Sequence, residues 1–138
     1  MRTSLFTFLA LSLLFVSRWA SAQETQKSPK PGFFVFSQNK VSDDNTVKLN
    51  AVFDSLSAPI LNELVKEGKL LGWGQLTHAW GDEWNYNWYF VTENHRAFLD
   101  FWSEYINRLN KRFPGWPDKI RGLLTEHKDN MYSIRTMR

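Results

Sequence analysis

The hydrophobic and polar positions after residue 32 follow first a strand pattern and then a helix pattern. The run 33–38, Phe-Phe-Val-Phe-Ser-Gln, is typical of a β-strand because it is rich in aromatic and β-branched residues. Between 42 and 68, apolar residues recur at steps of three and four, which predicts an amphipathic helix. Polar residues 42–45 offer its N-terminal cap, and Gly68 is a suitable C-terminal stop. Its apolar stripe comprises Leu49, Val52, Phe53, Leu56, Ile60 and Leu64.

Pro59 lies inside this predicted helix. A proline has no backbone N–H to donate, and its ring crowds the carbonyl group four residues earlier. We therefore expect the helix to kink or to restart near Ser57 rather than to run as one straight rod.

Two aromatic-rich segments, 70–80 and 84–92, are separated by Gly81, Asp82 and Glu83. Turn residues between two such runs predict an antiparallel hairpin. The aromatic residues are concentrated here, because Trp73, Trp80, Trp84 and Trp88 all fall in this hairpin.

A second helix is predicted from the cap Asn94 to the stop formed by Pro114 and Gly115. It carries the cleanest helical stripe of the chain, made of Phe98, Phe101, Trp102, Tyr105, Leu109 and Phe113. Residues 116–127 favour a short third helix, which would place His127 near a helix end. Residues 131–137 alternate like a last strand.

The resulting order, β, α, β, β, α, β, predicts a single α+β domain over 33–138 with the ferredoxin-like plait, an antiparallel sheet with helices on one face. The second face of such a sheet is uncovered. Because 18 of the 116 residues after Ala22 are aromatic, and monomers seldom expose large apolar patches, we expect a second copy of the chain to cover it as a homodimer.

The first 22 residues predict a cleaved signal peptide. Arg2 precedes an uncharged run of twelve residues, Leu5 to Val16, and the small residues Ala20 and Ala22 flank the expected cleavage position. A transmembrane helix needs roughly 20 apolar residues. We therefore expect a periplasmic or secreted protein with no membrane span in the mature chain, and a polar tether over 23–32.

Charge and cysteine content exclude several classes of function. Without the predicted signal peptide, 15 basic residues face 14 acidic ones, so nothing favours a nucleic-acid partner. The absence of cysteine excludes disulfides, thiol catalysis and cysteine-ligated metal sites. The three histidines do not have the spacing of a metal motif, and no nucleotide-binding loop occurs, so we expect neither a metal nor a cofactor.

The register of the hairpin decides which residues line a cavity, and two registers are open. A three-residue loop pairs Trp80 with Trp84 and Gly74 with Phe90. It is favoured because it separates apolar from polar side chains more sharply, and it collects on one face a set suited to a ligand cavity. That predicted ligand set is Trp73, Gln75, Thr77, Asn85, Asn87 and Tyr89.

The other register follows from a two-residue turn at Gly81 and Asp82. It puts Gln75 next to Trp88, on a face shared by Trp73, Gln75, Thr77, Trp84, Tyr86, Trp88 and Phe90. In both registers Trp73, Gln75 and Thr77 share a face, although such a stripe also suits core or interface packing.

The chain resembles the dimeric α/β barrel superfamily. The resemblance rests on the element order, the length, the kinked first helix and the stretch Pro59-Ile60-Leu61 through Glu67-Gly68-Lys69-Leu70 into Trp73-Gly74. In that superfamily two plaits pack sheet against sheet. It includes antibiotic-biosynthesis monooxygenases, EthD-like proteins, muconolactone isomerase, and the haem-binding chlorite dismutases and dye-decolorising peroxidases. The resemblance covers element order over 33–137 and carries no catalytic residue with it.

Three functional hypotheses follow. The first is an exported homodimer that binds a small apolar or aromatic ligand. The second is a cofactor-independent monooxygenase or isomerase of the antibiotic-biosynthesis monooxygenase type, with His78 as the candidate catalytic base and Gln75, Asn85, Asn87 or Tyr89 as orienting groups. The third, ranked last, is haem binding through His78 or His127.

Overall fold

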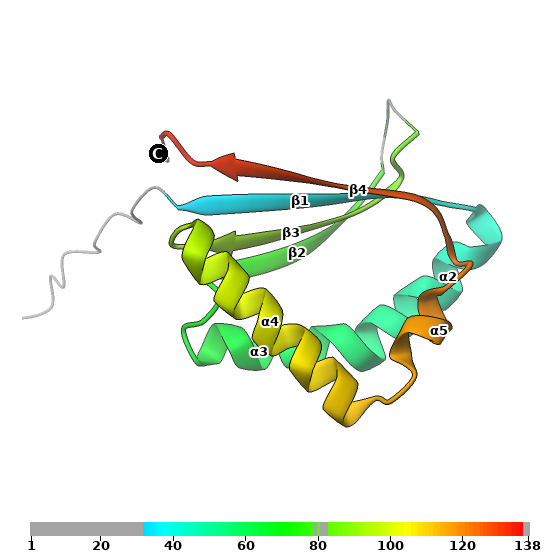
Figure 1. The fold of residues 1–138 in the computed structure, drawn as a ribbon. Helices are drawn as coiled ribbons and strands as arrows, with labels where there is room; N and C mark the ends of the chain where they lie inside the picture. Colours follow the sequence, from blue (N-terminus) through cyan, green and yellow to red (C-terminus); the bar gives the residue numbers. More distant parts are fainter. Residues whose placement is uncertain (1–31, 79, 81–82, 137–138) are drawn as a thin grey trace, which may run out of the picture.

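A computed structural model describes residues 32–78, 80 and 83–136 of the chain. Four strands form one antiparallel sheet in the order β2-β3-β1-β4. They are β1 (Phe33–Val41), β2 (Gly72–Thr77), β3 (Tyr86–Thr92) and β4 (Leu124–Ser133). All helices lie on one side of this sheet (Figure 1), which confirms the predicted ferredoxin-like arrangement. The predicted signal peptide, the tether up to residue 31 and the turn residues Gly81 and Asp82 lie outside the described residues.

The first helical segment is interrupted where Pro59 predicted it. It consists of α2 (Asp43–Val52), the π-helical turn η1 (Phe53–Ser57) and α3 (Ala58–Lys66). Within η1 the N–H of Ala58 donates to the carbonyl of Phe53, five residues earlier. Because Pro59 cannot donate a backbone hydrogen bond, the helical segment continues past it through this wider turn instead of through the regular α-helical hydrogen-bond pattern. Gly68 ends the segment in a left-handed conformation, as expected.

The second long helix also begins and ends as predicted. In α4 (His95–Arg112) the Asn94 side chain caps the helix by accepting a hydrogen bond from the N–H of Ala97 at 2.9 Å. Gly115 follows the helix in a left-handed conformation. The buried positions of this helix are Phe98, Phe101, Tyr105 and Leu109.

The C-terminal part differs from the prediction. The third helix, α5 (Trp116–Ile120), is confirmed but shorter than expected, and the last strand begins at Leu124 rather than at Met131. The position predicted for His127 near a helix end is therefore wrong, because this residue lies within β4. β4 is an edge strand and most of its residues are exposed. Its sequence accordingly lacks the apolar alternation that reveals a half-buried strand.

The favoured hairpin register is wrong. Gln75 pairs with Trp88 and Gly74 with Tyr89, which is the register of the two-residue turn. A shift of one residue moves side chains to the opposite face, so the predicted ligand set is divided between the two faces. The ring of Tyr89 lies directly over Gly74, where a Cβ atom would overlap it. An aromatic ring does cover a glycine as expected, but it belongs to Tyr89 and not to Phe90.

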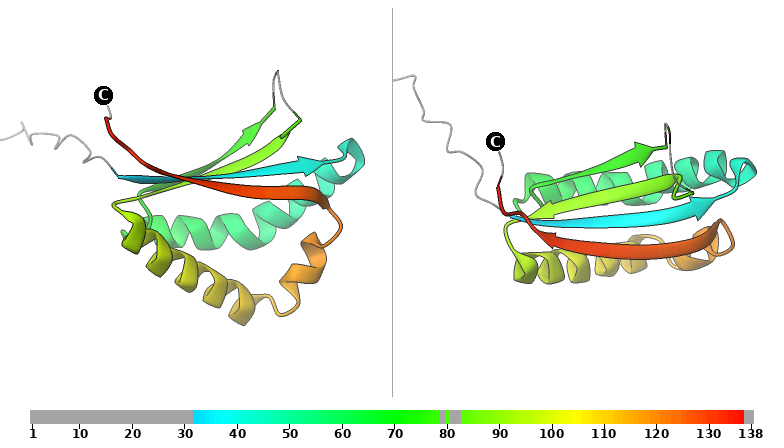
Figure 2. Two further views of the ribbon diagram at one scale, coloured as in Figure 1. Left: turned by 45° about the horizontal axis from the view of Figure 1, so that its top comes forward. Right: turned by 90° about the horizontal axis from the view of Figure 1, so that it is seen from above.

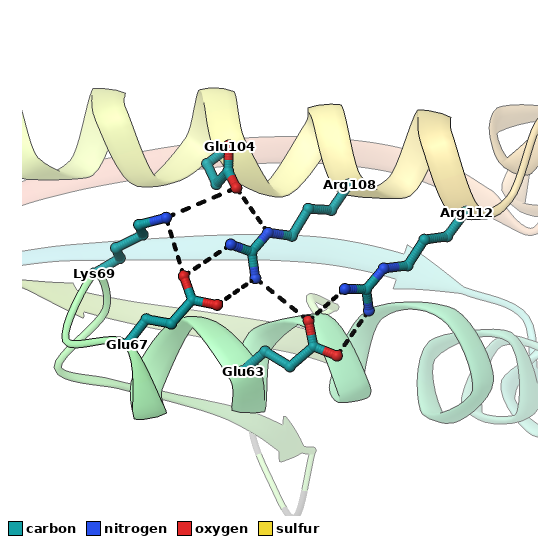
Figure 3. A network of polar contacts seen from close by, with 6 residues as sticks. All are labelled: Glu63, Glu67, Lys69, Glu104, Arg108 and Arg112. Carbon is teal, nitrogen blue, oxygen red and sulfur yellow. Dashed lines mark hydrogen bonds and ion pairs between the residues drawn. The ribbon is translucent and has the colours of Figure 1, made fainter.

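An ion-pair network fastens α3 to α4 across the outer surface of the helix layer (Figure 3). Arg108 is the centre of the network: its guanidinium contacts Glu67 through two hydrogen bonds of 2.8 Å and Glu104 through one of 2.8 Å. Arg112 binds Glu63 in the same two-point manner, at 2.7 and 2.6 Å. Its members are Glu63, Glu67, Lys69, Glu104, Arg108 and Arg112.

The network makes the free energy of unfolding sensitive to acid. The hydrogen bonds from Arg108 lower the pKa of Glu67 from 4.5 to about 2 and also lower the pKa of Glu104, and those from Arg112 lower the pKa of Glu63. A carboxylate with a lowered folded-state pKa stabilises the fold above its unfolded pKa and loses that contribution as the pH falls through its folded pKa. We expect stability to fall between pH 4.5 and about 2, less steeply in Glu67→Gln, as measured by urea unfolding at several pH values.

Glu93→Gln is the matched control, because Glu93 forms no ion pair with any other described residue. Equal pH dependence of Glu67→Gln and the unsubstituted protein would mean that the network does not contribute to acid stability.

Candidate functional site

A cavity of about 250 Å³ lies between the sheet and the helices. Strands β1, β3 and β4 form its floor, with Ser37 and Phe90 among the floor residues. The segment from α2 to η1 forms one wall, and α4 and α5 form the other. Most wall side chains are apolar: Leu49, Val52, Phe53, Leu56, Trp102, Ile106, Trp116 and Ile120. The cavity is thus an apolar space beside a sheet, which is a common setting for small-molecule binding.

The floor becomes polar towards one end. On the helix-facing side of the sheet, Ser37 pairs with Trp88 on one neighbouring strand and with Asp129 on the other. In the next row, Asn39 pairs with Tyr86 and His127 in the same way. Ser37, His127 and Asp129 all line the cavity, so the polar groups of its floor are gathered at this end.

His127 is held between an amide and a carboxylate. The buried Asn39 amide donates through Nδ2 to the carbonyl of Tyr86 at 2.9 Å, which turns its Oδ1 towards His127 Nδ1, 2.8 Å away. Because Oδ1 can only accept, the imidazole proton must lie on Nδ1. Nε2, the other ring nitrogen, faces the Asp129 carboxylate at 3.2 Å. About half of the His127 side chain is exposed, so this pair stands at the rim of the cavity.

Tyr105 and Tyr86 stay neutral at physiological pH. Burial raises the pKa of each phenol to about 12. The Tyr105 hydroxyl, on the α4 wall, donates to Ser57 Oγ at 2.8 Å, and the Tyr86 hydroxyl donates to Asn50 Oδ1 at 2.8 Å. The indole Nε1 of Trp88 is buried and has no hydrogen-bond partner among the described residues. These hydrogen bonds hold the aromatic side chains in place. Ser57 only accepts in its bond with Tyr105, so its own hydroxyl proton is not donated there.

The structure brings Trp73 and Gln75 close to the cavity but not into its lining. The Trp73 indole donates to Asn62 at 3.1 Å, and the Gln75 amide donates to Asn50 at 2.8 Å. Both side chains therefore join β2 to the first helical segment beside the cavity. The backbone of Thr77 pairs with Tyr86 in register.

The other predicted site residues lie elsewhere. The Asn85 side chain binds the backbone of Val41 twice: Oδ1 accepts from the Val41 N–H at 2.9 Å, and Nδ2 donates to the Val41 carbonyl at 2.8 Å. Asn87 and Tyr89 face the side of the sheet away from the helices, because their register partners are Leu76 and Gly74. His78 follows the end of β2, is exposed, and does not line the cavity.

Sequence reasoning missed most of the cavity residues, including Ser37, Tyr105, Ile106 and Asp129. One signal was available: buried positions alternate along β1, and Ser37 and Asn39 occupy two of them. Polar residues on the core face of a strand are unusual enough to indicate a special role.

The described residues show no arrangement suited to a metal or a haem. They contain no group of three or more potential metal ligands. Both ring nitrogens of His127 already have partners, and His78 is outside the cavity, so neither histidine is poised to bind iron. No helix among the described residues is long and apolar enough to cross a membrane.

The opposite side of the sheet is uncovered in the described part of the chain (Figure 2). Apolar side chains gather on it around Phe34, whose ring lies 5.7 Å from Tyr89, 6.1 Å from Phe36 and 6.3 Å from Tyr132, measured between centroids. We call this set the open-face cluster; it comprises Phe34, Phe36, Leu76, Tyr89, Val91 and Tyr132.

Comparison with solved structures places this arrangement of elements among known folds. A dimeric ferredoxin-like protein from an uncultured marine organism matches with a TM-score of 0.63 and 12% identity, over 80% of this chain and 93% of that one. The fold is ferredoxin-like. A nipsnap family protein of unknown function from Agrobacterium tumefaciens matches with a TM-score of 0.55 and 16% identity, over 75% of this chain and 87% of that one.

A putative antibiotic biosynthesis monooxygenase from Nitrosomonas europaea matches with a TM-score of 0.55 and 12% identity, over 75% of this chain and 99% of that one. These neighbours share the fold that the resemblance led us to expect. No protein-family description matches the chain. No curated protein matches it either.

Proposed function

We propose that this protein is an exported homodimer that binds a small, largely apolar ring molecule in the cavity between its sheet and its helices. The cavity carries this proposal for the ligand, because an apolar space of about 250 Å³ inside a small domain costs stability unless something occupies it. Known ligand pockets begin at about 300 Å³, so a molecule of one or two rings is the appropriate size.

The open-face cluster supports the dimer. Six apolar side chains, four of them aromatic, share one side of a sheet that the described residues leave uncovered. Beyond them the same face is charged, with Lys40 contacting Glu83 at 2.7 Å and Glu126 at 3.0 Å. An apolar centre beside a polar rim is the composition of a homodimer interface. The dimeric structural neighbour offers a precedent for this assembly.

A second candidate function is cofactor-independent oxygenase or isomerase chemistry. The observation that favours it is the pair His127 and Asp129 at the cavity rim, because an imidazole and a carboxylate are the side-chain groups that most often act as general bases, and both line the cavity. In this proposal His127 takes the role that the sequence pattern suggested for His78. Such an activity requires that a ligand be bound first, so ligand binding is tested before turnover.

Native mass spectrometry of the protein from its source tests the main proposal in one experiment. The expected result is a dimer of chains that begin at Gln23 and carry a retained small molecule. Ile106→Trp, which fills the cavity from α4, is expected to abolish that retention. Leu99→Trp on the same helix is the control, because Leu99 is exposed and does not line the cavity.

Each part of the proposal can fail separately. Retention that is equal in Ile106→Trp and Leu99→Trp would place the ligand outside the cavity. A monomer at every concentration would contradict the proposed dimer. A mature protein that still carries residues 1–22 would contradict the proposed cleavage of the signal peptide.

A further inference from the structure

We infer that the cavity selects ring molecules that carry a carbonyl oxygen, and that the hydroxyl groups of Ser37 and Ser57 recognise this oxygen. The inference rests on the proposed function, since it names the chemical class of the ligand for the same cavity. Its evidence is the hydrogen-bonding state of these two serines.

Ser37 is a buried residue whose hydroxyl has no partner in the described part of the chain. The residue is only 5% exposed, it lies on the helix-facing side of β1, and it lines the cavity. Its side chain forms no hydrogen bond with any other described residue. Its Oγ is also not among the fully enclosed atoms that lack a partner, so it borders the cavity space itself. A buried hydroxyl left in this state costs free energy unless a ligand or water satisfies it.

Ser57 supplies a second donor from the opposite layer. It lies in η1, where it lines the cavity and accepts a hydrogen bond from the Tyr105 hydroxyl at 2.8 Å. This bond occupies one lone pair of Ser57 and leaves its own proton unused among the described residues. The π-helical turn therefore presents to the cavity a hydroxyl that is already polarised by a neutral phenol.

Two unused donors in an apolar cavity favour a ligand oxygen that accepts without needing to donate. A carbonyl oxygen has two lone pairs and no proton, so it satisfies this requirement. The aromatic walls, including Phe53 and Trp88, match the remaining flat part of such a molecule. His127 and Asp129 line the polar end of the floor beside Ser37, which is the register partner of Asp129, and about half of each of these two side chains is exposed at the rim.

Two probes that differ only at the carbonyl test this inference. 1-Tetralone and tetralin share a fused two-ring skeleton, and only tetralone has the oxygen. We expect the unsubstituted protein to bind tetralone more tightly, as measured by quenching of tryptophan fluorescence. Ser37→Ala and Ser57→Ala should each weaken tetralone binding about fivefold while tetralin binding stays the same, since a neutral hydrogen bond contributes that much.

Ser55→Ala is the matched control. Ser55 lies in the same π-helical turn, but its hydroxyl is exposed, binds the carbonyl of Ala51 at 2.7 Å and does not line the cavity. It should bind both probes as the unsubstituted protein does.

The outcomes separate this inference from the proposed function. If both probes bind and their affinity ratio is unchanged in Ser37→Ala and Ser57→Ala, the carbonyl inference is overturned and ligand binding in the cavity stands. If neither probe binds the unsubstituted protein, the inference and the proposed binding of ring molecules fail together. If the preference for tetralone over tetralin is reduced in both serine variants but not in Ser55→Ala, the inference is supported, and an effect in only one of them overturns the role of the other serine.

Discussion

Phe34→Glu is expected to convert the proposed homodimer into monomers. Phe34 occupies the middle of the open-face cluster, where its ring lies within 6.3 Å of the rings of Phe36, Tyr89 and Tyr132. A carboxylate at this position would be buried against apolar groups of the second copy without a partner of opposite charge. An uncompensated buried charge costs several kcal/mol, so we expect dimer affinity to fall by about a thousandfold or more. Sedimentation velocity over a range of concentrations measures this change.

The matched control is Leu99→Glu. Leu99 is an exposed apolar residue of α4, on the side of the sheet away from the open-face cluster. Its replacement should leave the dimer intact and rule out a general effect of added negative charge. If Phe34→Glu remains a dimer while Leu99→Glu dissociates, the two copies meet through the helices and not through the sheets.

Phe101→Ala is expected to lower the free energy of unfolding by about 3–5 kcal/mol. Phe101 is 1% exposed, and its ring lies 5.6 Å from Phe90 of the sheet and 6.0 Å from both Phe98 and Tyr105 of α4. Its removal would leave a void where α4 packs on β3, and the neighbouring rings can fill this void only by leaving their own contacts. Because a small domain has only about 5–15 kcal/mol of stability, the loss is large. Urea unfolding followed by tryptophan fluorescence measures it.

Leu99→Ala, two residues earlier in the same helix, is the control for helix propensity. Its side chain is exposed, so its truncation should change stability by less than about 0.5 kcal/mol. Similar losses in both variants would show that α4 is not anchored through its aromatic stripe.

The fold could be predicted because the elements that define it have amphipathic sequences. In α4 the stripe that includes Phe98 and Tyr105 follows the helical period, and Asn94 caps it as expected. Pro59 marked the interruption of the first helix, because the loss of one backbone donor is a local effect. β4 was placed too late in the sequence, because an exposed edge strand needs no apolar alternation.

The hairpin register could not be decided from residue types. Both registers keep Trp73 and Gln75 on one face, and they differ only in the number of loop residues. The favoured one grouped apolar side chains with one another, whereas the protein places Trp88 against Phe53, with ring centroids 5.3 Å apart, and Tyr89 over Gly74. These contacts join β3 to a helix in one case and to a neighbouring strand in the other, so local alternation carries no information about them.

The sequence by itself determined the element order, the helix boundaries at Asn94 and Gly68, and the existence of a sheet face that requires a cover, because these depend on periodicity and on local backbone chemistry. Only the tertiary structure decided that the cavity lies between sheet and helices, and that Ser37, Ser57 and His127 border it. These three residues come from β1, η1 and β4, and the packing of distant elements alone brings them together. Their hydrogen bonds, and those they lack, are therefore a property of the folded chain.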